Sequence, residues 1–180
     1  MAQAVLIQNR VAAMNVDAYN RSAIAGEDLD NGNVFRLDSL NSSTGCEVWD
    51  VAVPTASAST LDNLWMAYSP EVVITSQGTK QYKGLSPDPQ DFTNTGSLVF
   101  DAFLPQVGDV ITLTGDAFTG TVNDYANSGS AVHTLHWAAA AVAASLTLTR
   151  LDTTYISIGS GSTLGDTQRQ TAYKMQVTNN

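Results

Sequence analysis

Hydrophobic and polar residues alternate with a period of two along most of the patterned stretches of this chain. Alternating runs occupy residues 46–53, 110–114, 146–149, 155–158 and 171–177, and a β-branched run occupies residues 72–74. Alternation places successive side chains on opposite faces of an extended backbone, so each run predicts a strand. Ile111 and Leu113 would share one face, and Tyr173, Met175 and Val177 another.

Turn-forming residues separate these runs. Pro54 stops the first run, Gly108 and Gly115 flank the run at 110–114, and the glycine-rich segment 159–162 lies between the last two. Short strands bounded by such residues are typical of sheet-on-sheet or closed-sheet architectures. The sequence therefore predicts a mainly β fold, either an antiparallel β-sandwich or a small β-barrel, with at most one short helix.

Two stretches depart from the strand pattern. Residues 138–144 are rich in alanine, which indicates either a short helix or a packed crossover. Near the start, Ile7, Val11 and Met14 fall at helical spacing, but β-branched and polar residues interrupt them and favour an extended arm. We predict an arm over residues 1–20, followed by a single β-rich domain over residues 21–180.

The charge balance narrows the choice of partners. Eight Lys and Arg stand against 17 Asp and Glu, and no basic residue lies between Lys83 and Arg150. Binding to nucleic acid or to an anionic membrane depends on clustered Lys and Arg, so neither is a predicted partner. Only 14% of the residues are charged, against roughly 25% in an average domain. A surface of neutral hydroxyls and amides is cheap to desolvate, which favours assembly.

The few groups that could carry chemistry do not form a recognisable site. His133 and His136 have no carboxylate in the sequence run around them, and opposite faces of a strand would separate them. The segment 27–33 resembles a calcium loop, but Leu29 stands where a ligand is required, so an acidic hairpin turn with its tip at Asn31 and Gly32 is the simpler interpretation.

Covalent catalysis and cofactor binding are not predicted either. Cys46 is the only cysteine and falls in an alternating run, which predicts a buried structural thiol. The segment 159–165 lacks the Lys of a phosphate-binding loop, so it is interpreted as a turn. Three tryptophans, Trp49, Trp65 and Trp137, could form either core or a sugar-stacking platform. We predict a protein that is not an enzyme and needs no cofactor.

Several short strings, taken in order, carry a family resemblance. They are Asp30-Asn-Gly-Asn-Val-Phe35, Leu64-Trp-Met-Ala-Tyr-Ser-Pro-Glu71, Tyr82-Lys-Gly-Leu-Ser-Pro-Asp-Pro-Gln-Asp-Phe92, Phe100-Asp-Ala-Phe-Leu-Pro-Gln-Val-Gly-Asp-Val-Ile111, Thr154-Tyr-Ile-Ser-Ile158 and Thr167-Gln-Arg-Gln-Thr-Ala-Tyr-Lys174. Together they resemble the head decoration (capsid cement) proteins of tailed bacteriophages. The resemblance implies a protein without catalytic residues that binds the outer surface of a phage capsid and stabilises the shell.

The expected partner is then the major capsid protein, and the expected location is the exterior of the virion. The start of the chain lacks the basic leader and apolar stretch of a secretory signal, so synthesis in the host cytoplasm is expected. We further expect a homo-oligomer, because closed symmetric assemblies match local symmetry axes of a capsid. The alternative is a carbohydrate-binding or adhesive β-module displayed on a virion.

The N-terminal segment is the predicted capsid contact. We expect it to act as a docking arm that becomes ordered on contact with the shell. The residues expected to make the contact are Ala2, Val5, Leu6, Ile7, Val11 and Met14.

Overall fold

Strands make up most of the protein in the computed structural model. It describes residues 4–13, 19–44, 46–55, 63–77, 80–85, 92–129, 131–142, 146–159 and 167–180, with the backbone alone for 73–77, 80–85, 158–159 and 167–168. Strands account for 52% of the chain, and no helix in the described ranges reaches seven residues. The predicted mainly β fold is therefore confirmed, and a small barrel is part of it.

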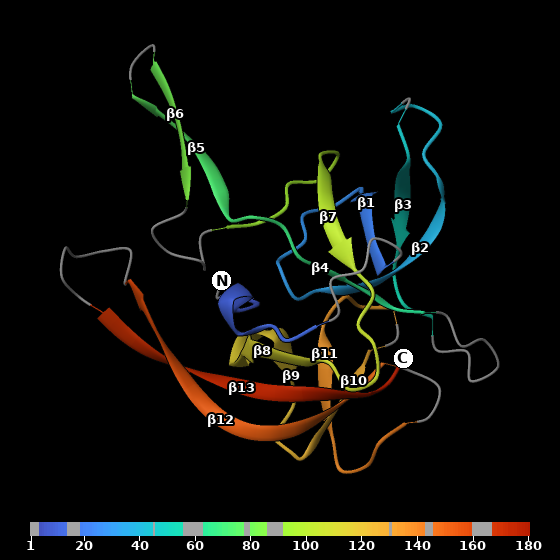
Figure 1. Ribbon diagram of the computed structural model, residues 1–180, viewed down its shortest axis with the longest axis vertical. Coiled ribbons are helices and arrows are strands. Elements are labelled where there is room, and N and C mark those ends of the chain that lie inside the picture. The colour runs from blue at the N-terminus through green and yellow to red at the C-terminus, as the bar shows by residue number, and fades with distance from the viewer. Residues whose placement is uncertain are drawn as a thin grey trace.

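Five strands close into that small barrel (Figure 1). In spatial order they are β1 (Asn20–Ile24), β3 (Val48–Ala52), β2 (Val34–Leu40), β4 (Trp65–Ala67) and β7 (Val99–Phe103). The pairing is antiparallel except between β1 and β3, which run parallel. Phe35 and Phe100 meet edge to face inside, with ring centroids 5.6 Å apart, and pack in a core with Trp65 and Leu29.

Six further strands form a sheet that curls into half a barrel (Figure 1). In spatial order they are β8 (Val110–Thr114), β13 (Thr167–Asn179), β12 (Thr147–Gly159), β10 (Tyr125–Ser128), β11 (Leu135–Ala138) and β9 (Phe118–Thr119). Tyr173, Met175 and Val177 of β13 point into the larger core, as their alternation predicted. No helix among the described residues has the length and apolar character needed to cross a membrane.

A two-stranded hairpin stands apart from both sheets. Strands β5 (Val72–Gln77) and β6 (Lys80–Leu85) pair with each other along their whole length and with no other described strand. Figure 1 shows the hairpin projecting from the body in green. Because an isolated two-stranded hairpin is marginally stable in water, a partner would stabilise this one.

The N-terminal segment lies on the edge of the half-barrel, and this corrects the prediction of an arm that becomes ordered only on contact. The Ile7 amide donates to the Thr112 carbonyl at 2.9 Å, and Ala12 and Val110 exchange hydrogen bonds of 2.7 and 2.8 Å. A short 3-10 helix, η1 (Gln8–Arg10), separates the two contacts. The segment therefore pairs with β8 in the manner of a further edge strand, and its apolar side chains complete the core of the half-barrel.

Cys46 and the alanine-rich stretch also differ from expectation. Cys46 is exposed, because β3 begins only at Val48. Ala138 ends β11, and residues 139–142 form an exposed, non-helical connection. Alternation alone overestimated the length of the strand at 46–53. Of the two alternatives for the alanine-rich stretch, residues 139–142 form a crossover and not a helix, and residues 143 and 144 lie outside the described residues.

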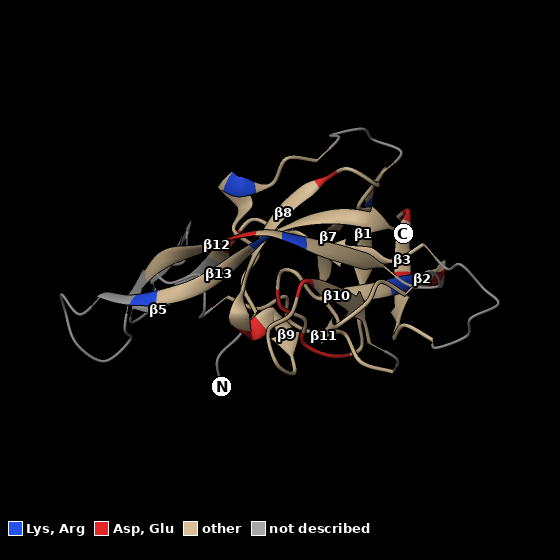
Figure 2. Ribbon diagram, turned by 90° about the horizontal axis from the view of Figure 1, so that it is seen from below, with Lys and Arg blue, Asp and Glu red and all other residues tan. Residues whose placement is uncertain are grey.

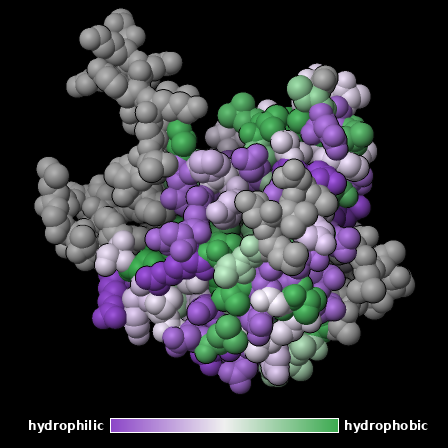
Figure 3. Space-filling model, in the orientation of Figure 1, coloured by the Kyte–Doolittle hydropathy of each residue, from purple (hydrophilic) through white to green (hydrophobic). Residues whose placement is uncertain are grey.

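Charged side chains are sparse over the surface. Figure 2 shows few blue and red segments among the tan ribbon. In Figure 3 the visible face mixes hydrophilic and hydrophobic patches. Two exposed aliphatic residues, Leu98 and Val99, are consecutive and lie at the start of β7.

Candidate docking surface

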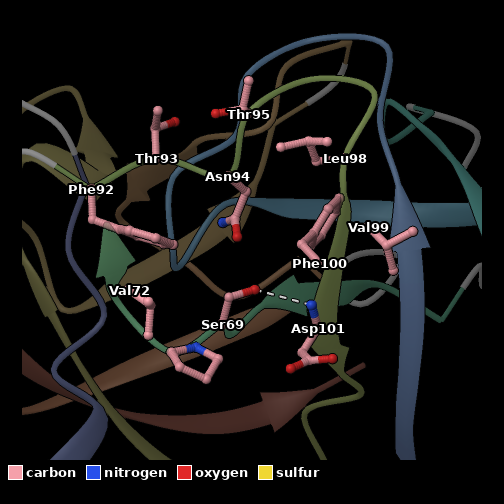
Figure 4. A pocket seen from close by; sticks show the side chains of 11 residues that line it. Ser69, Val72, Phe92, Thr93, Asn94, Thr95, Leu98, Val99, Phe100 and Asp101 are labelled. Carbon is pink, nitrogen blue, oxygen red and sulfur yellow. Dashed lines mark hydrogen bonds between the residues drawn. The ribbon is translucent and has the colours of Figure 1, made fainter. Parts of the chain in front are cut away.

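A groove opens beside β7, at the foot of the β5–β6 hairpin (Figure 4). Its volume is about 350 Å³. Segments far apart in the sequence form its walls: residues 69–72 on one side, residues 92–95 on another and residues 98–101 on a third. The apolar lining includes Val72, Phe92, Leu98 and Val99, and the polar lining includes Ser69, Asn94 and Asp101.

Pro70 explains why the groove is open. Strands β4 and β7 pair at Met66–Phe103 and Ala67–Ala102, and the Tyr68 amide still donates to the Asp101 carbonyl at 2.9 Å. Two residues further along this register, Pro70 would face Val99. Proline has no N–H to donate, so the ladder cannot continue. The chain turns away at Pro70, so no described strand pairs with the start of β7 on that side.

The backbone of Val99 therefore points into the groove. The Asp101 carbonyl accepts the Tyr68 amide, and the Asp101 amide donates to the Ser69 hydroxyl at 3.0 Å. The backbone N–H and C=O of Asp101 therefore point towards β4. Backbone groups two residues apart along a strand point the same way. Val99 has no hydrogen bond on that side to any residue of the described chain. A free donor and a free acceptor at a strand edge form a site for strand addition.

Apolar side chains surround this open edge. Leu98 is 61% exposed and Val99 is 52% exposed. Both lie beside Val72 and the nearly buried Phe92 in the lining of the groove. A large exposed apolar pair next to a concave surface is typical of a protein interaction site.

A buried polar network fixes the walls of the groove. Asn31, only 2% exposed, donates to the Ser69 carbonyl at 2.9 Å and accepts from the Ser69 amide at 3.0 Å. Asn94 donates to Asn31 Oδ1 at 3.2 Å and to the Leu29 carbonyl at 2.9 Å. Satisfied buried networks of this kind rigidify their surroundings, so the groove is preformed. The turn predicted at Asn31 and Gly32 is present, and the Asn33 amide donates to the Asp30 carbonyl at 3.0 Å. This turn is buried and supports the groove, and the strands on either side of it, β1 and β2, do not pair with each other as a hairpin would.

Asp30 connects this network to the N-terminal segment. Its carboxylate accepts the Ala4 amide at 3.0 Å. Burial raises the pKa of Asp30 above its ordinary value of 3.8, because desolvation outweighs the hydrogen bonds from Ala4 and Thr93, and the neighbouring Asp28 charge also raises it. The folded state therefore holds a proton on Asp30 at a pH where the unfolded chain has released it.

The stability of the protein should depend on pH through Asp30. The stabilising contribution of its protonation is complete below pH 3.8 and is lost as the pH rises through the higher folded-state pKa. We expect the free energy of unfolding of the wild type, minus that of Asp30→Asn, to fall as the pH increases through this window. Urea unfolding at a series of pH values measures the difference, and a difference that rises with pH would contradict the assignment.

The six residues predicted to contact a capsid do not line this groove where they are described. Val5 and Leu6 are buried in the protein's own core, which removes them from any surface role, while Ile7 and Val11 are half-buried. Ala2 and Met14 lie outside the described residues. The contact residues predicted from the sequence are therefore corrected for Val5 and Leu6.

The two histidines have structural partners. His133 places Nδ1 2.8 Å from the Val34 carbonyl and Nε2 3.2 Å from Glu27, which joins the half-barrel to the barrel. His136 lies 2.6 Å from the Thr119 hydroxyl. Within the described part of the chain, no three His, Cys, Asp or Glu residues are placed to hold a metal ion.

Comparison with known proteins adds no relative. No protein-family model, no curated protein and no solved structure matches this chain. Function is therefore inferred from the groove and from the resemblance of the sequence strings.

Proposed function

We propose that this protein is a structural component of a bacteriophage particle that binds the outer surface of the capsid and stabilises the shell. The observation that carries the protein-binding role is the open strand edge at Val99, set in a groove with the exposed side chains of Leu98 and Val99. The resemblance of strings such as 64–71 and 100–111 to capsid decoration proteins supplies the kind of partner.

Binding of this kind stabilises a shell by mass action. A protein that binds the assembled lattice and not the free subunits shifts the equilibrium towards the lattice at every copy of the site. Many modest contacts then add up across a particle. A preformed groove suits this role, because little conformational entropy is lost when a segment enters it.

The partner in this proposal is the major capsid protein, and the place of action is the exterior of the virion. The surface chemistry supports a protein partner. The net charge of −9 disfavours phosphate backbones, and the low content of charged residues lowers the cost of burying the surface. We also propose a homo-oligomer, since symmetric assemblies can occupy local symmetry axes of a capsid.

No observation favours the carbohydrate-binding alternative as a second proposal. Stacking on a sugar requires an exposed aromatic face. Trp65 is 8% exposed inside the barrel, and the ring of Trp137 stacks on Phe118 at a centroid distance of 4.5 Å in the half-barrel core. Trp49 is half-buried on β3. The three rings lie in separate places and do not form one platform.

Sedimentation with empty capsid shells tests the proposal. The shells are assembled from the major capsid protein of a phage that encodes this chain. We expect saturable binding to assembled shells, an increase in the temperature at which the shells come apart, and no binding to unassembled capsid subunits. Failure to sediment with the shells, or equal binding to free subunits, would overturn the proposed function.

A further inference from the structure

We infer that the groove binds an extended segment of the capsid protein, which adds a strand beside Val99 and inserts an aliphatic side chain among Val72, Phe92 and Leu98. This inference rests on the proposed function and deepens it by naming the contact. Three features of the groove support it: a free backbone edge, an apolar lining and the sign of the surrounding charge.

The backbone edge selects an extended partner. Val99 presents an amide and a carbonyl on the side where Pro70 has ended the β4 ladder. These two groups need a donor and an acceptor at the spacing of a neighbouring strand. A helix satisfies its own backbone groups and could not supply them, whereas an extended segment can.

The lining selects an aliphatic anchor. The groove measures about 350 Å³, which is near the lower end of ligand-pocket sizes. It can take a few side chains and not a folded element. Val72, Phe92 and Leu98 lie on three different sides of the groove (Figure 4), so an inserted Leu, Ile or Val would contact apolar side chains from each of them.

Charge favours a foreign segment over a second copy of this chain. Among the described residues that line the groove, Asp101 is the only ionisable one. The sequence has no Lys or Arg from residue 84 to residue 149. Arg21 and Asp101 both line the adjacent depression. A second copy would bring its own net charge of −9 to this surface. A segment with Lys or Arg beside its aliphatic anchor would complement Asp101.

Substitution of Val99 separates backbone pairing from side-chain packing. Val99→Pro removes the N–H that points into the groove, while the pairing of β7 with β1 uses the neighbouring residues and is retained. Val99→Thr keeps the amide and the β-branched shape and is the matched control. We expect Val99→Pro to bind empty capsid shells at least about tenfold more weakly than the wild type, because a buried carbonyl of the partner loses its donor. Val99→Thr should bind within about threefold of the wild type.

Leu98→Asp provides an independent test. It places a charge in the apolar lining at a residue that is exposed in the free protein, so the fold should tolerate it. We expect sedimentation with the shells to be lost. Val107→Asp, at a residue that is 67% exposed and outside the groove, is the control and should bind as the wild type does.

The outcomes distinguish this inference from the proposed function. If the wild type does not bind shells, the proposed function fails. If the wild type binds and both Val99→Pro and Leu98→Asp bind equally well, the groove is not the contact and the inference alone is overturned. If the two variants instead lower the solution mass of the free protein from an oligomer to a monomer, the occupant is a second copy, which also overturns it. Circular dichroism confirms that each variant is folded.

Discussion

Leu6→Ala is expected to lower the free energy of unfolding by about 3 kcal/mol, within the range for a fully buried leucine. Leu6 is 0% exposed and belongs to the core of the half-barrel. Its backbone bridges to Leu113 at the sheet edge, so the segment cannot easily move to fill the cavity. Urea unfolding followed by tryptophan fluorescence measures the change.

The control for this prediction is Val107→Ala. Val107 is exposed in a turn, and its truncation should change the free energy of unfolding by less than about 0.5 kcal/mol. Equal stability of Leu6→Ala and the wild type would show that the N-terminal segment is detached in solution. In that case the original expectation of a free docking arm would replace the edge strand described above.

Gly32→Ala is expected to destabilise the protein by about 3 kcal/mol, from two separate sources. Gly32 has φ of +95°, a conformation that costs an L-residue about 1 kcal/mol or more. A Cβ at this position would also lie 2.6 Å from Leu113 Cδ2, and overpacking of a core costs about 1–3 kcal/mol. The turn at Gly32 packs against Leu6 and Leu113, where the barrel meets the half-barrel.

Gly108→Ala separates the two sources. Gly108 has φ of +100°, but nothing lies within 4 Å of an added Cβ. It should therefore lose only the conformational part, about 1 kcal/mol. Equal losses for the two substitutions, measured by urea unfolding, would contradict the close packing of Gly32 against Leu113.

Much of the fold could be predicted from local pattern. The strands around Ile111 and Leu113, and around Tyr173, Met175 and Val177, lie where the alternation placed them, and their side chains are buried together. Period-two alternation arises when one face of a strand is buried, and the pattern is visible within a few consecutive residues. The parallel pairing of β1 with β3 could not be predicted, because no local pattern records which strands become neighbours.

The N-terminal segment shows a second limit. Its apolar residues were recognised, but the surface that they pack against was not. An apolar stretch can pack against a partner or against its own domain, and in this protein it packs against the edge of β8 beside Leu113. Cys46 was predicted to be buried and is exposed, because the alternating run begins before the first residue of β3.

The groove was not predicted, although two of its signals stand in the sequence. Pro70 follows the β4 strand and ends its ladder, and Leu98-Val99 is an apolar pair at the start of β7. Neither signal alone predicts a groove. Only the register between β4 and β7 places Pro70 opposite Val99, and register depends on contacts between residues more than 30 positions apart.

Electron cryo-microscopy of phage particles with and without this chain can locate the protein on the particle. We predict additional density on the outer surface of the capsid only in particles that contain the chain, with an extended capsid segment lying along the Val99 edge of β7. Particles of identical appearance, or density in which another face of the protein meets the shell, would contradict it.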